Sequence, residues 1–414
     1  MDSGRSSTWR GADTGDDDMT TAAVKESMKQ WLRSYGVTKR HLNFPQYYVP
    51  YLFGSGRAFV PQSLTLELTF RCNLSCQMCP LDLPRLMHDG QSKEFIKERK
   101  GVELTSPEIH RIIDDLARFG VKNLTLTGGE VFLRHDILEI VEHVKQTPMK
   151  LCVNTNGWYL KPQVADRLVE LKVDSMSVSI DGPDATHDEI RRGKGSFKRL
   201  AEGIANLSAA KKARGANRPF IGITCTIFAL NQHNFSEVID AVHDLGVTSV
   251  DYEYMFYTTQ DAIDRTRAMI PLPYRPKEEN QILPDELRQV DPDLFMSQVK
   301  RAESQGEQYG IPVSFGPPFK TKEQIRLRFE DPDYAFVEKC FYPWKSARIN
   351  PYGDVYSCSI DVEFGNVRER PFSKIWNNDA YRTFRKTLKE RQLFPKCTKC
   401  CALNNQFWRY LPTP

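Results

Sequence analysis

The stretch TFRCNLSCQMCP, residues 69–80, holds three of the chain's ten cysteines in a C-x3-C-x2-C spacing: Cys72, Cys76 and Cys79. Cysteine thiolate is the usual ligand of iron–sulfur clusters. Three thiolates can hold three irons of a 4Fe–4S cluster and leave the fourth iron open, and an open metal position is what catalysis requires, whereas a closed site is usually structural. The alternative is a zinc knuckle that takes its fourth ligand from elsewhere, with His88 as the candidate.

Composition and charge describe an ordinary globular protein. Hydrophobic residues make up 40% of the 414 residues and charged residues 27%, and the net charge of +4 is small for this length. No basic run is interleaved with aromatics, so nucleic acid is not an expected partner. The sequence has no secretory signal and no run of about 18 apolar residues that could span a membrane. We expect a cytoplasmic protein, where clustered cysteines bind metal more often than they form disulfides.

Working outward from the cysteine stretch, the chain alternates between strand and helix patterns. The helix at 106–120 is expected to have Ser106 as N-cap, Pro107 as its first residue and Gly120 at its end. Six strand–helix units between about residues 63 and 310 predict a parallel sheet, either open or closed into a barrel with fewer than the eight units of a TIM barrel. The strands are expected at 63–70, 121–128, 149–157, 173–181, 220–228 and 247–255.

The distinctive polar segments all follow predicted strands. The cysteine loop follows the first strand, TGGE (127–130) ends the second, NTNG (154–157) the third and SVSIDG (177–182) the fourth. Because chemistry in parallel α/β folds gathers at the carboxyl ends of the strands, these segments are expected to share one site. Gly128 and Gly129 lack Cβ atoms, so the backbone there can approach a ligand closely.

With these motifs in this order, the chain resembles radical S-adenosylmethionine (radical SAM) enzymes over about residues 60–315. The resemblance implies a partial (β/α)6 TIM-like barrel in which Cys72, Cys76 and Cys79 hold a 4Fe–4S cluster. It implies that the amino and carboxylate groups of S-adenosylmethionine chelate the open iron. One mild departure is Met78, where the family often has an aromatic residue. The cofactor contacts that the resemblance implies, besides the two glycines, are Glu130, Asn156, Ser179, Asp181 and Arg192, with Arg191 as substitute for Arg192.

The C-terminal tail carries five more cysteines. PWKSARINPYGDVYSC (343–358) predicts a hairpin that turns at NPYGD. A four-thiolate set of this kind could be structural zinc. Together with the core, residues 335–405 resemble the SPASM or twitch extension, which binds an auxiliary iron–sulfur cluster. By that resemblance the ligands are Cys340, Cys358, Cys397 and Cys400, and Cys401 is the spare, although Cys400 and Cys401 could exchange roles.

The expected organisation has five parts: residues 1–20 a disordered tail, 21–62 an N-terminal helix and aromatic lead-in, 63–315 the partial barrel, 316–334 a linker and 335–414 the auxiliary cluster domain. The loop at 257–283 is a candidate substrate lid, with Tyr252, Glu253, Tyr254 and Tyr257 nearby. A surface insertion is the alternative.

The resemblance implies reductive cleavage of S-adenosylmethionine to a 5′-deoxyadenosyl radical, with flavodoxin or ferredoxin as electron donor. A thiolate-filled auxiliary cluster favours oxidation of a small polar metabolite, such as an aminocyclitol or sugar alcohol. The alternatives are a peptide maturase, an epimerase with a cysteine hydrogen donor, and a redox module without catalysis. Glu253 is a candidate base. Cys225 is the candidate donor, although strand alternation favours a core position for Cys225, and Cys152 is also expected in the core.

Overall fold

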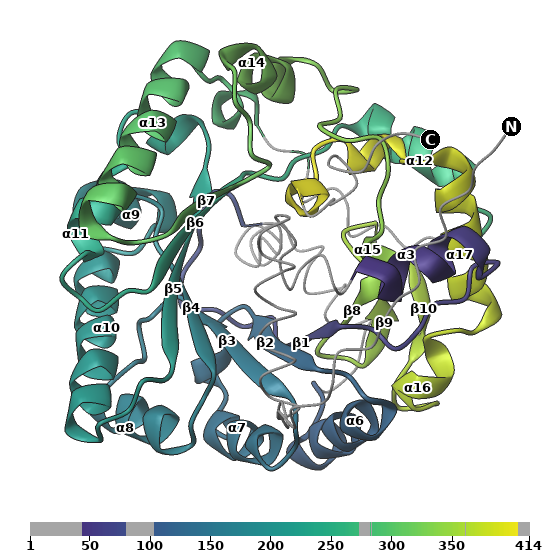
Figure 1. Ribbon diagram of the computed structural model, residues 1–414, viewed down its shortest axis with the longest axis horizontal. Helices are drawn as coiled ribbons and strands as arrows, with labels where there is room; N and C mark the ends of the chain where they lie inside the picture. The colour runs from purple at the N-terminus through teal and green to yellow at the C-terminus, as the bar shows by residue number, and fades with distance from the viewer. Residues whose placement is uncertain (1–43, 80–102, 273–281, 283, 361, 405–414) are drawn as a thin grey trace, which may run out of the picture. The chain divides into compact units, whose positions relative to one another are not determined.

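The core of the fold is a sheet in which seven strands follow one another in chain order. The computed structural model describes residues 44–79, 103–272, 282, 284–360 and 362–404, and the chain divides into residues 1–45 and 46–414. The second unit is described below. The expected tail at 1–20 lies outside the described residues. Each strand from β1 to β7 pairs in parallel with the next (Figure 1). The strands are β1 Ser63–Thr69, β2 Asn123–Gly128, β3 Lys150–Thr155, β4 Ser175–Ser179, β5 Phe220–Ile227, β6 Ser249–Tyr254 and β7 Val313–Gly316.

Helices cover the outer face of this sheet, as Figure 1 shows for α6–α8, α10, α11 and α13. Along β2 to β6, fully buried apolar residues alternate with partly accessible, mostly short polar ones. The apolar positions pack against the helices and the polar positions form the inner face. The helices of the barrel are α6 Ser106–Phe119, α7 Ile137–Lys145, α8 Pro162–Glu170, α9 Asp184–Arg191, α10 Ser196–Ala213, α11 Glu237–Val242, α12 Gln260–Met269 and α13 Pro292–Tyr309.

The partial barrel is confirmed, with three differences in detail. A seventh strand, β7, follows the six that were predicted. Helix α6 begins one residue earlier than expected, because Thr105 forms a capping box with Glu108 while the Ser106 hydroxyl donates to Asp136 at 2.6 Å. The expected lid contains helix α12, which packs against the 3-10 turn η5, Pro395–Cys397. Residues 273–281 and 283 of that segment lie outside the described residues.

The C-terminal hairpin extends the same sheet. Strand β8, Ser346–Ile349, pairs in parallel with β1, and Ser63 lies opposite Ser346. Strand β9, Asp354–Tyr356, pairs with β8 in antiparallel fashion, and β10, Glu363–Asn366, follows β9 at the edge. The predicted turn at 350–354 is present, with Gly353 at φ +92°. The cysteine-rich extension is therefore joined to the strand that leads into the first cysteine loop.

The aromatic lead-in and the expected linker each contain a helix. In the aromatic lead-in, helix α3, Phe44–Phe53, packs Tyr51 against Phe341 and Trp344, with ring centroids 4.6 and 5.0 Å apart. The expected linker contains α14, Lys322–Glu330, which has a Thr321–Gln324 capping box and buries Ile325 and Phe329. Three more helices complete the C-terminal part: α15 Tyr342–Lys345, α16 Phe372–Ile375 and α17 Asp379–Arg391.

Candidate active site

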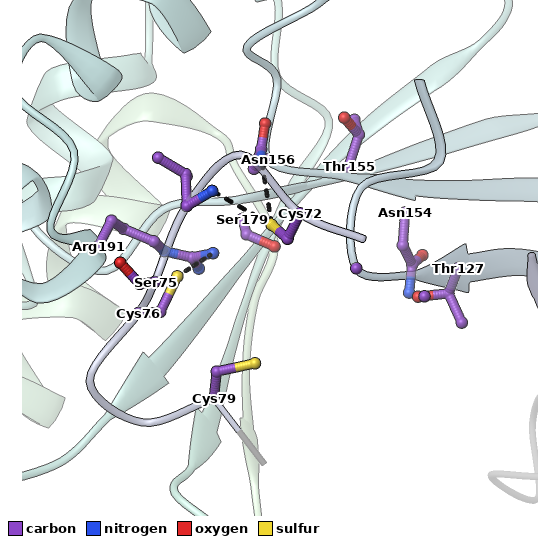
Figure 2. A pocket seen from close by; sticks show the side chains of 13 residues that line it. Cys72, Ser75, Cys76, Cys79, Thr127, Asn154, Thr155, Asn156, Ser179 and Arg191 are labelled. Atoms are coloured by element: carbon purple, nitrogen blue, oxygen red, sulfur yellow. Dashed lines mark hydrogen bonds between the residues drawn. The ribbon is translucent and has the colours of Figure 1, made fainter. Parts of the chain in front are cut away.

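Three thiols gather in one cavity at the carboxyl ends of the strands. The cavity has a volume of about 180 Å³ and is shown in Figure 2. Seven of the predicted site residues line it: Cys72, Cys76, Cys79, Gly128, Gly129, Asn156 and Ser179. Glu130, Asp181 and Arg192 are not among its lining residues, whereas Arg191, Thr127, Asn154 and Thr155 are. Strand alternation could have identified Thr127 and Asn154, since both are inner-face positions next to the predicted motifs.

The two glycines serve the cysteine loop itself. A Cβ atom on Gly128 would overlap the carbonyl oxygen of Thr69, and one on Gly129 would overlap that of Arg71. The Gly129 N–H donates to the Thr69 carbonyl at 2.8 Å, and the Glu130 N–H donates to the Arg71 carbonyl at 2.9 Å. The close approach expected of these glycines is thus an approach to protein backbone. It holds the start of the cysteine loop against the end of β2.

Glu130 is turned into the protein. Its carboxylate accepts hydrogen bonds from the Thr155 hydroxyl at 2.9 Å, the Asn156 N–H at 2.8 Å and the Phe132 N–H at 3.1 Å. The side chain is fully buried, and burial raises its pKa although these donors oppose the rise. In the structure the carboxylate therefore organises the loop after β3.

Of the two adjacent arginines, Arg191 enters the cavity. Its Nε donates to Asp181 Oδ2 at 2.6 Å, and its Nη1 donates to Cys76 Sγ at 3.7 Å (Figure 2). Arg192 is the C-cap of α9, with φ +50°, and its side chain is exposed. Asp181 is fully buried, and its other oxygen accepts from the Thr226 N–H at 2.9 Å. In this structure Asp181 therefore supports Arg191 from behind the cavity.

The donors around the thiols suit a thiolate-bound cluster. The Leu74 N–H donates to Cys72 Sγ at 3.4 Å, and the Asn156 amide lies 4.0 Å from the same sulfur. Burial raises the pKa of Cys72 and Cys76, while Arg191 opposes the rise at both. Such donors stabilise negative charge on sulfur and tune iron–sulfur clusters. Among the described residues no group of three or more His, Cys, Asp or Glu side chains already converges on one ion position, so the fit rests on chemistry and placement.

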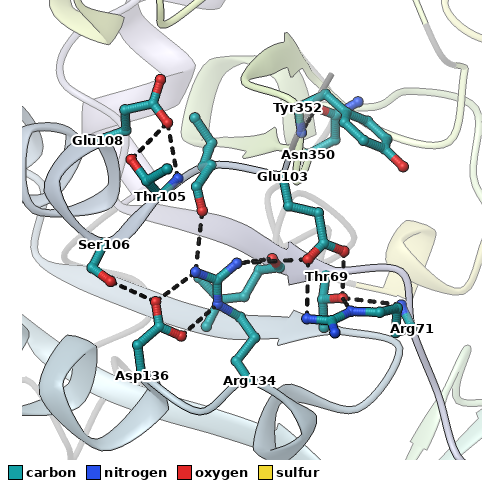
Figure 3. A network of polar contacts seen from close by, with 12 residues as sticks. Thr69, Arg71, Glu103, Thr105, Ser106, Glu108, Arg134, Asp136, Asn350 and Tyr352 are labelled. Carbon is teal, nitrogen blue, oxygen red and sulfur yellow. Dashed lines mark hydrogen bonds and ion pairs between the residues drawn. The ribbon is translucent and has the colours of Figure 1, made fainter. Parts of the chain in front are cut away.

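Polar contacts also anchor the strand end from which the cysteine loop departs (Figure 3). Arg134 is buried, donates to the Leu68 carbonyl at 3.1 Å and forms a bidentate ion pair with Asp136 at 2.6 and 2.9 Å. The Thr69 hydroxyl donates to Glu103 at 2.5 Å. Bidentate arginine–carboxylate pairs are geometrically specific. These contacts hold the last residues of β1 in place just ahead of Cys72.

The tail cysteines form a second group. Cys340 and Cys358 both act electrostatically on Cys397, and burial raises the pKa of Cys340 to about 12. The Cys400 N–H donates to the Cys397 carbonyl at 3.0 Å, so the CxxC segment is a tight turn. None of the ten cysteines, all of which lie in the described ranges, forms a disulfide.

Cys401 interacts with the barrel as well as with the other tail cysteines. Its thiol lies close to Cys400, and it also interacts electrostatically with the carboxylate of Glu253 on the inner face of β6. The Glu253 side chain is accessible, but the surrounding protein desolvates it in part and so raises its pKa, and the thiol opposes the rise. The tail therefore reaches the inner face of the barrel at the carboxyl end of β6.

The remaining candidates lie elsewhere. Cys225 is fully buried on the helix-facing side of β5, as alternation predicted. Cys152 was expected in the core, but it is partly accessible and shares its face of β3 with the cavity-lining Asn154. Tyr252 and Tyr254 are buried on the helix side of β6, and Tyr257 donates its hydroxyl to the Arg328 carbonyl at 2.6 Å. These tyrosines are packing residues in the structure.

Comparison with known proteins identifies the class. Residues 66–246 match the family model of the radical SAM superfamily, and residues 340–401 match SPASM, an iron–sulfur cluster-binding domain. The chain belongs to the radical SAM superfamily and carries a C-terminal SPASM domain. Its cofactors are S-adenosylmethionine, the 4Fe–4S cluster that binds it and an auxiliary iron–sulfur cluster. No helix within the described ranges is long and apolar enough to cross a membrane.

Its relatives have diverse activities. An AdoMet-dependent heme synthase of Methanosarcina barkeri is 29% identical over 82% of this chain and 88% of its own length. The sporulation killing factor maturation protein SkfB of Bacillus subtilis is 33% identical over 46% of this chain and 40% of its own. The structure of Streptococcus suis SuiB bound to S-adenosylmethionine is similar with a TM-score of 0.57 at 14% identity, covering 89% of this chain and 79% of SuiB. SuiB has also been solved with its precursor peptide SuiA.

Proposed function

We propose that the protein is a radical SAM oxidoreductase that removes two electrons and two protons from a substrate. When bound, the first cluster and S-adenosylmethionine supply a 5′-deoxyadenosyl radical, which takes a hydrogen atom from the substrate. Cys72, Cys76 and Cys79 are the proposed ligands of that cluster. Arg191, rather than Arg192, is the proposed partner of the cofactor carboxylate, because its guanidinium lies in the cavity beside Cys76.

The observation that carries the oxidative outcome is that the cysteine tail meets the barrel beside Glu253: Arg328 donates both to the Lys399 carbonyl and to the Met255 carbonyl just past the end of β6, and Cys401 acts electrostatically on Glu253. The substrate radical must lose one electron and one proton to become a closed-shell product. Cys340, Cys358, Cys397 and Cys400 are the proposed ligands of the auxiliary cluster, and four thiolates leave no iron open for substrate, which suits electron acceptance. Glu253 lies next to that loop on the inner face, so it is the proposed base for the proton.

The inner face supports a polar substrate. Its positions along β2 to β5 are short and hydroxyl-rich, and the Ser177 and Thr224 hydroxyls lie 2.8 Å apart. The inner-face residues are Thr125, Thr127, Cys152, Asn154, Ser175, Ser177, Ser179, Gly222, Thr224 and Thr226. A small polyhydroxylated metabolite, of the aminocyclitol or sugar alcohol kind, can hydrogen-bond to such a surface.

Peptide maturation is the second candidate. It is favoured by the likeness to SkfB, a maturation protein, and to SuiB, which binds a precursor peptide. The likeness to a heme synthase makes porphyrins a third substrate class to be tested beside polyols and peptides.

Mass spectrometry of anaerobic reactions distinguishes these substrates. Reconstituted protein, S-adenosylmethionine and a reductant are incubated with polyols, precursor peptides or porphyrins. A product two mass units lighter than a polyol supports the proposal. A modified peptide or porphyrin, with polyols untouched, would replace it. Replacing Cys72, Cys76 and Cys79 with Ala should abolish 5′-deoxyadenosine formation, and undiminished formation would refute the role of the loop.

The electron that starts the reaction is proposed to come from a flavodoxin or ferredoxin. A cytoplasmic location is proposed as well, since ten described cysteines without a disulfide are typical of a reducing compartment.

A further inference from the structure

A buried guanidinium lies beside the tail cysteines without a carboxylate among its main partners. Arg328, on α14, is 1% exposed. The acidic groups that act on it most strongly are Tyr257, Cys401, Cys400 and Tyr254, and burial lowers its pKa from the usual value. Its Nε has no hydrogen-bond acceptor within the described part of the chain. An ionised group buried in this way is costly unless a counter-charge accompanies it.

The other guanidinium nitrogens bind the cysteine loop to the barrel. Nη2 donates to the Lys399 carbonyl at 2.5 Å and to the Met255 carbonyl at 2.9 Å, just past the end of β6. Nη1 lies 3.5 Å from the Thr398 carbonyl. Arg328 therefore touches the two residues between Cys397 and Cys400 and the strand end next to Glu253.

The missing counter-charge fits the proposed cluster. A 4Fe–4S cluster held by four thiolates is an anion, and gaining an electron makes it more negative. A fixed positive charge at short range in a low-dielectric interior stabilises the more negative state. Net charge and hydrogen bonding around a cluster are main determinants of its reduction potential. The neutral carbonyls that hold Arg328 in place leave its charge available for this purpose.

We propose that Arg328 is a positioning residue of the auxiliary site, the counter-cation that raises the reduction potential of the auxiliary cluster and makes it an electron acceptor. The proposal rests on the ligand set Cys340, Cys358, Cys397 and Cys400 given under Proposed function. It assigns Arg328 no contact with the substrate.

The test is a redox titration of the auxiliary cluster followed by electron paramagnetic resonance. The full chain is reconstituted with Cys72, Cys76 and Cys79 replaced by Ala, so that only the auxiliary cluster is titrated. In this background Arg328→Gln should lower the potential by 59 mV or more, a tenfold shift of the one-electron equilibrium. Arg326→Gln is the matched control, because Arg326 lies on the same helix but pairs with Glu323 and Glu330 in solvent. The control should titrate like the unaltered background.

Arg328→Lys separates charge from packing. It keeps the charge and loses the forked contacts, so its potential should stay near that of the background even if its cluster binds less tightly. If Arg328→Gln does not fold, this variant decides alone: a potential near the background supports the proposal, and a drop of 59 mV or more overturns it. An unchanged potential in folded Arg328→Gln also overturns it. Iron content tests the ligand set separately, because retention of the cluster after replacement of Cys397 and Cys400 by Ala refutes the ligands rather than the role of Arg328.

Discussion

Arg191 and Asp181 form a buried ion pair, Nε to Oδ2 at 2.6 Å, directly behind the cysteine loop. The pair fixes a guanidinium in the cavity at the point where it also donates to Cys76. Asp181 is itself held by the Thr226 N–H. The position of the cavity cation is therefore set by the ends of β4 and β5, independently of any ligand.

The first prediction compares the two adjacent arginines. Arg191→Ala should weaken binding of S-adenosylmethionine by at least about tenfold, since a charge-assisted hydrogen bond is worth roughly 1.5–3 kcal/mol. Arg192→Ala should leave binding unchanged, because that side chain is exposed. Equilibrium binding to the reconstituted protein measures both. Equal losses in the two variants would show that the cavity position of Arg191 has no bearing on the cofactor.

The second prediction concerns Gly129. An alanine Cβ there would overlap the Arg71 carbonyl and break the contact between the end of β2 and the cysteine loop. Gly129→Ala should therefore lose most of the iron of the first cluster on reconstitution. Gly215→Ala is the control: unlike Gly129, Gly215 has a positive φ, +59°, but its Cβ would meet nothing within 4 Å. The control should cost only the backbone strain, about 1–2 kcal/mol, and keep its iron. Full iron in Gly129→Ala would contradict the account of the glycine pair.

The third prediction is a pH dependence from His187. Burial, with a smaller effect of Arg191, lowers the pKa of His187 to about 3, and its Nδ1 accepts the Asp181 N–H at 3.3 Å. In the unfolded chain histidine titrates near 6.5, so between pH 6.5 and 3 the unfolded state binds more protons and stability falls as pH falls. Relative to His187→Gln, the wild type should lose about 2 kcal/mol between pH 7 and pH 5. Denaturant unfolding of the cluster-free protein measures this, and parallel pH curves for the two chains would contradict it.

Features that depend on residues close together in the sequence could be predicted, and features that depend on distant residues could not. The cysteine spacing and the alternation of apolar residues are local signals, and they identified the cluster loop and six of the seven strands β1–β7. Strand β8 pairs with β1, so Ser346 lies opposite Ser63 although the whole barrel separates them in the sequence. No local pattern encodes that contact. Arg191 and Arg192 are neighbours, and only the point at which α9 ends decides which one enters the cavity.

Some features that the sequence analysis missed do have a weak local signal in the sequence. The Thr321–Gln324 capping box before Ile325 and Phe329 marks helix α14, but the apolar pattern that follows is short. The carboxylate of Glu130 could not be placed from sequence, because its partners come from the loop after β3. Cys152 lies between Leu151 and Val153, so strict alternation of these two buried residues places it on the opposite, inner face.

The fourth prediction tests the electron-acceptor role. Replacing Cys397 and Cys400 with Ala should lower the iron content from about eight to about four per chain. Cleavage of S-adenosylmethionine should persist while oxidised product falls, because the substrate radical loses its acceptor. The variant must first be shown to be folded, since a four-cysteine site also contributes folding energy. With that established, unchanged oxidised product would refute the role.

The last prediction concerns the epimerase alternative and the two barrel thiols. Should the product prove isomeric with the substrate and carry solvent deuterium at one carbon, a thiol must return the hydrogen atom. Cys225 is fully buried on the helix side, whereas Cys152 is partly accessible on the face that lines the cavity. Cys152→Ala should then abolish deuterium incorporation, while Cys225→Ala should retain it and cost only packing stability. Mass spectrometry of product formed in deuterated water gives the result. If Cys225→Ala lost the deuterium and Cys152→Ala retained it, Cys225 rather than Cys152 would be the hydrogen donor, and the prediction would be wrong.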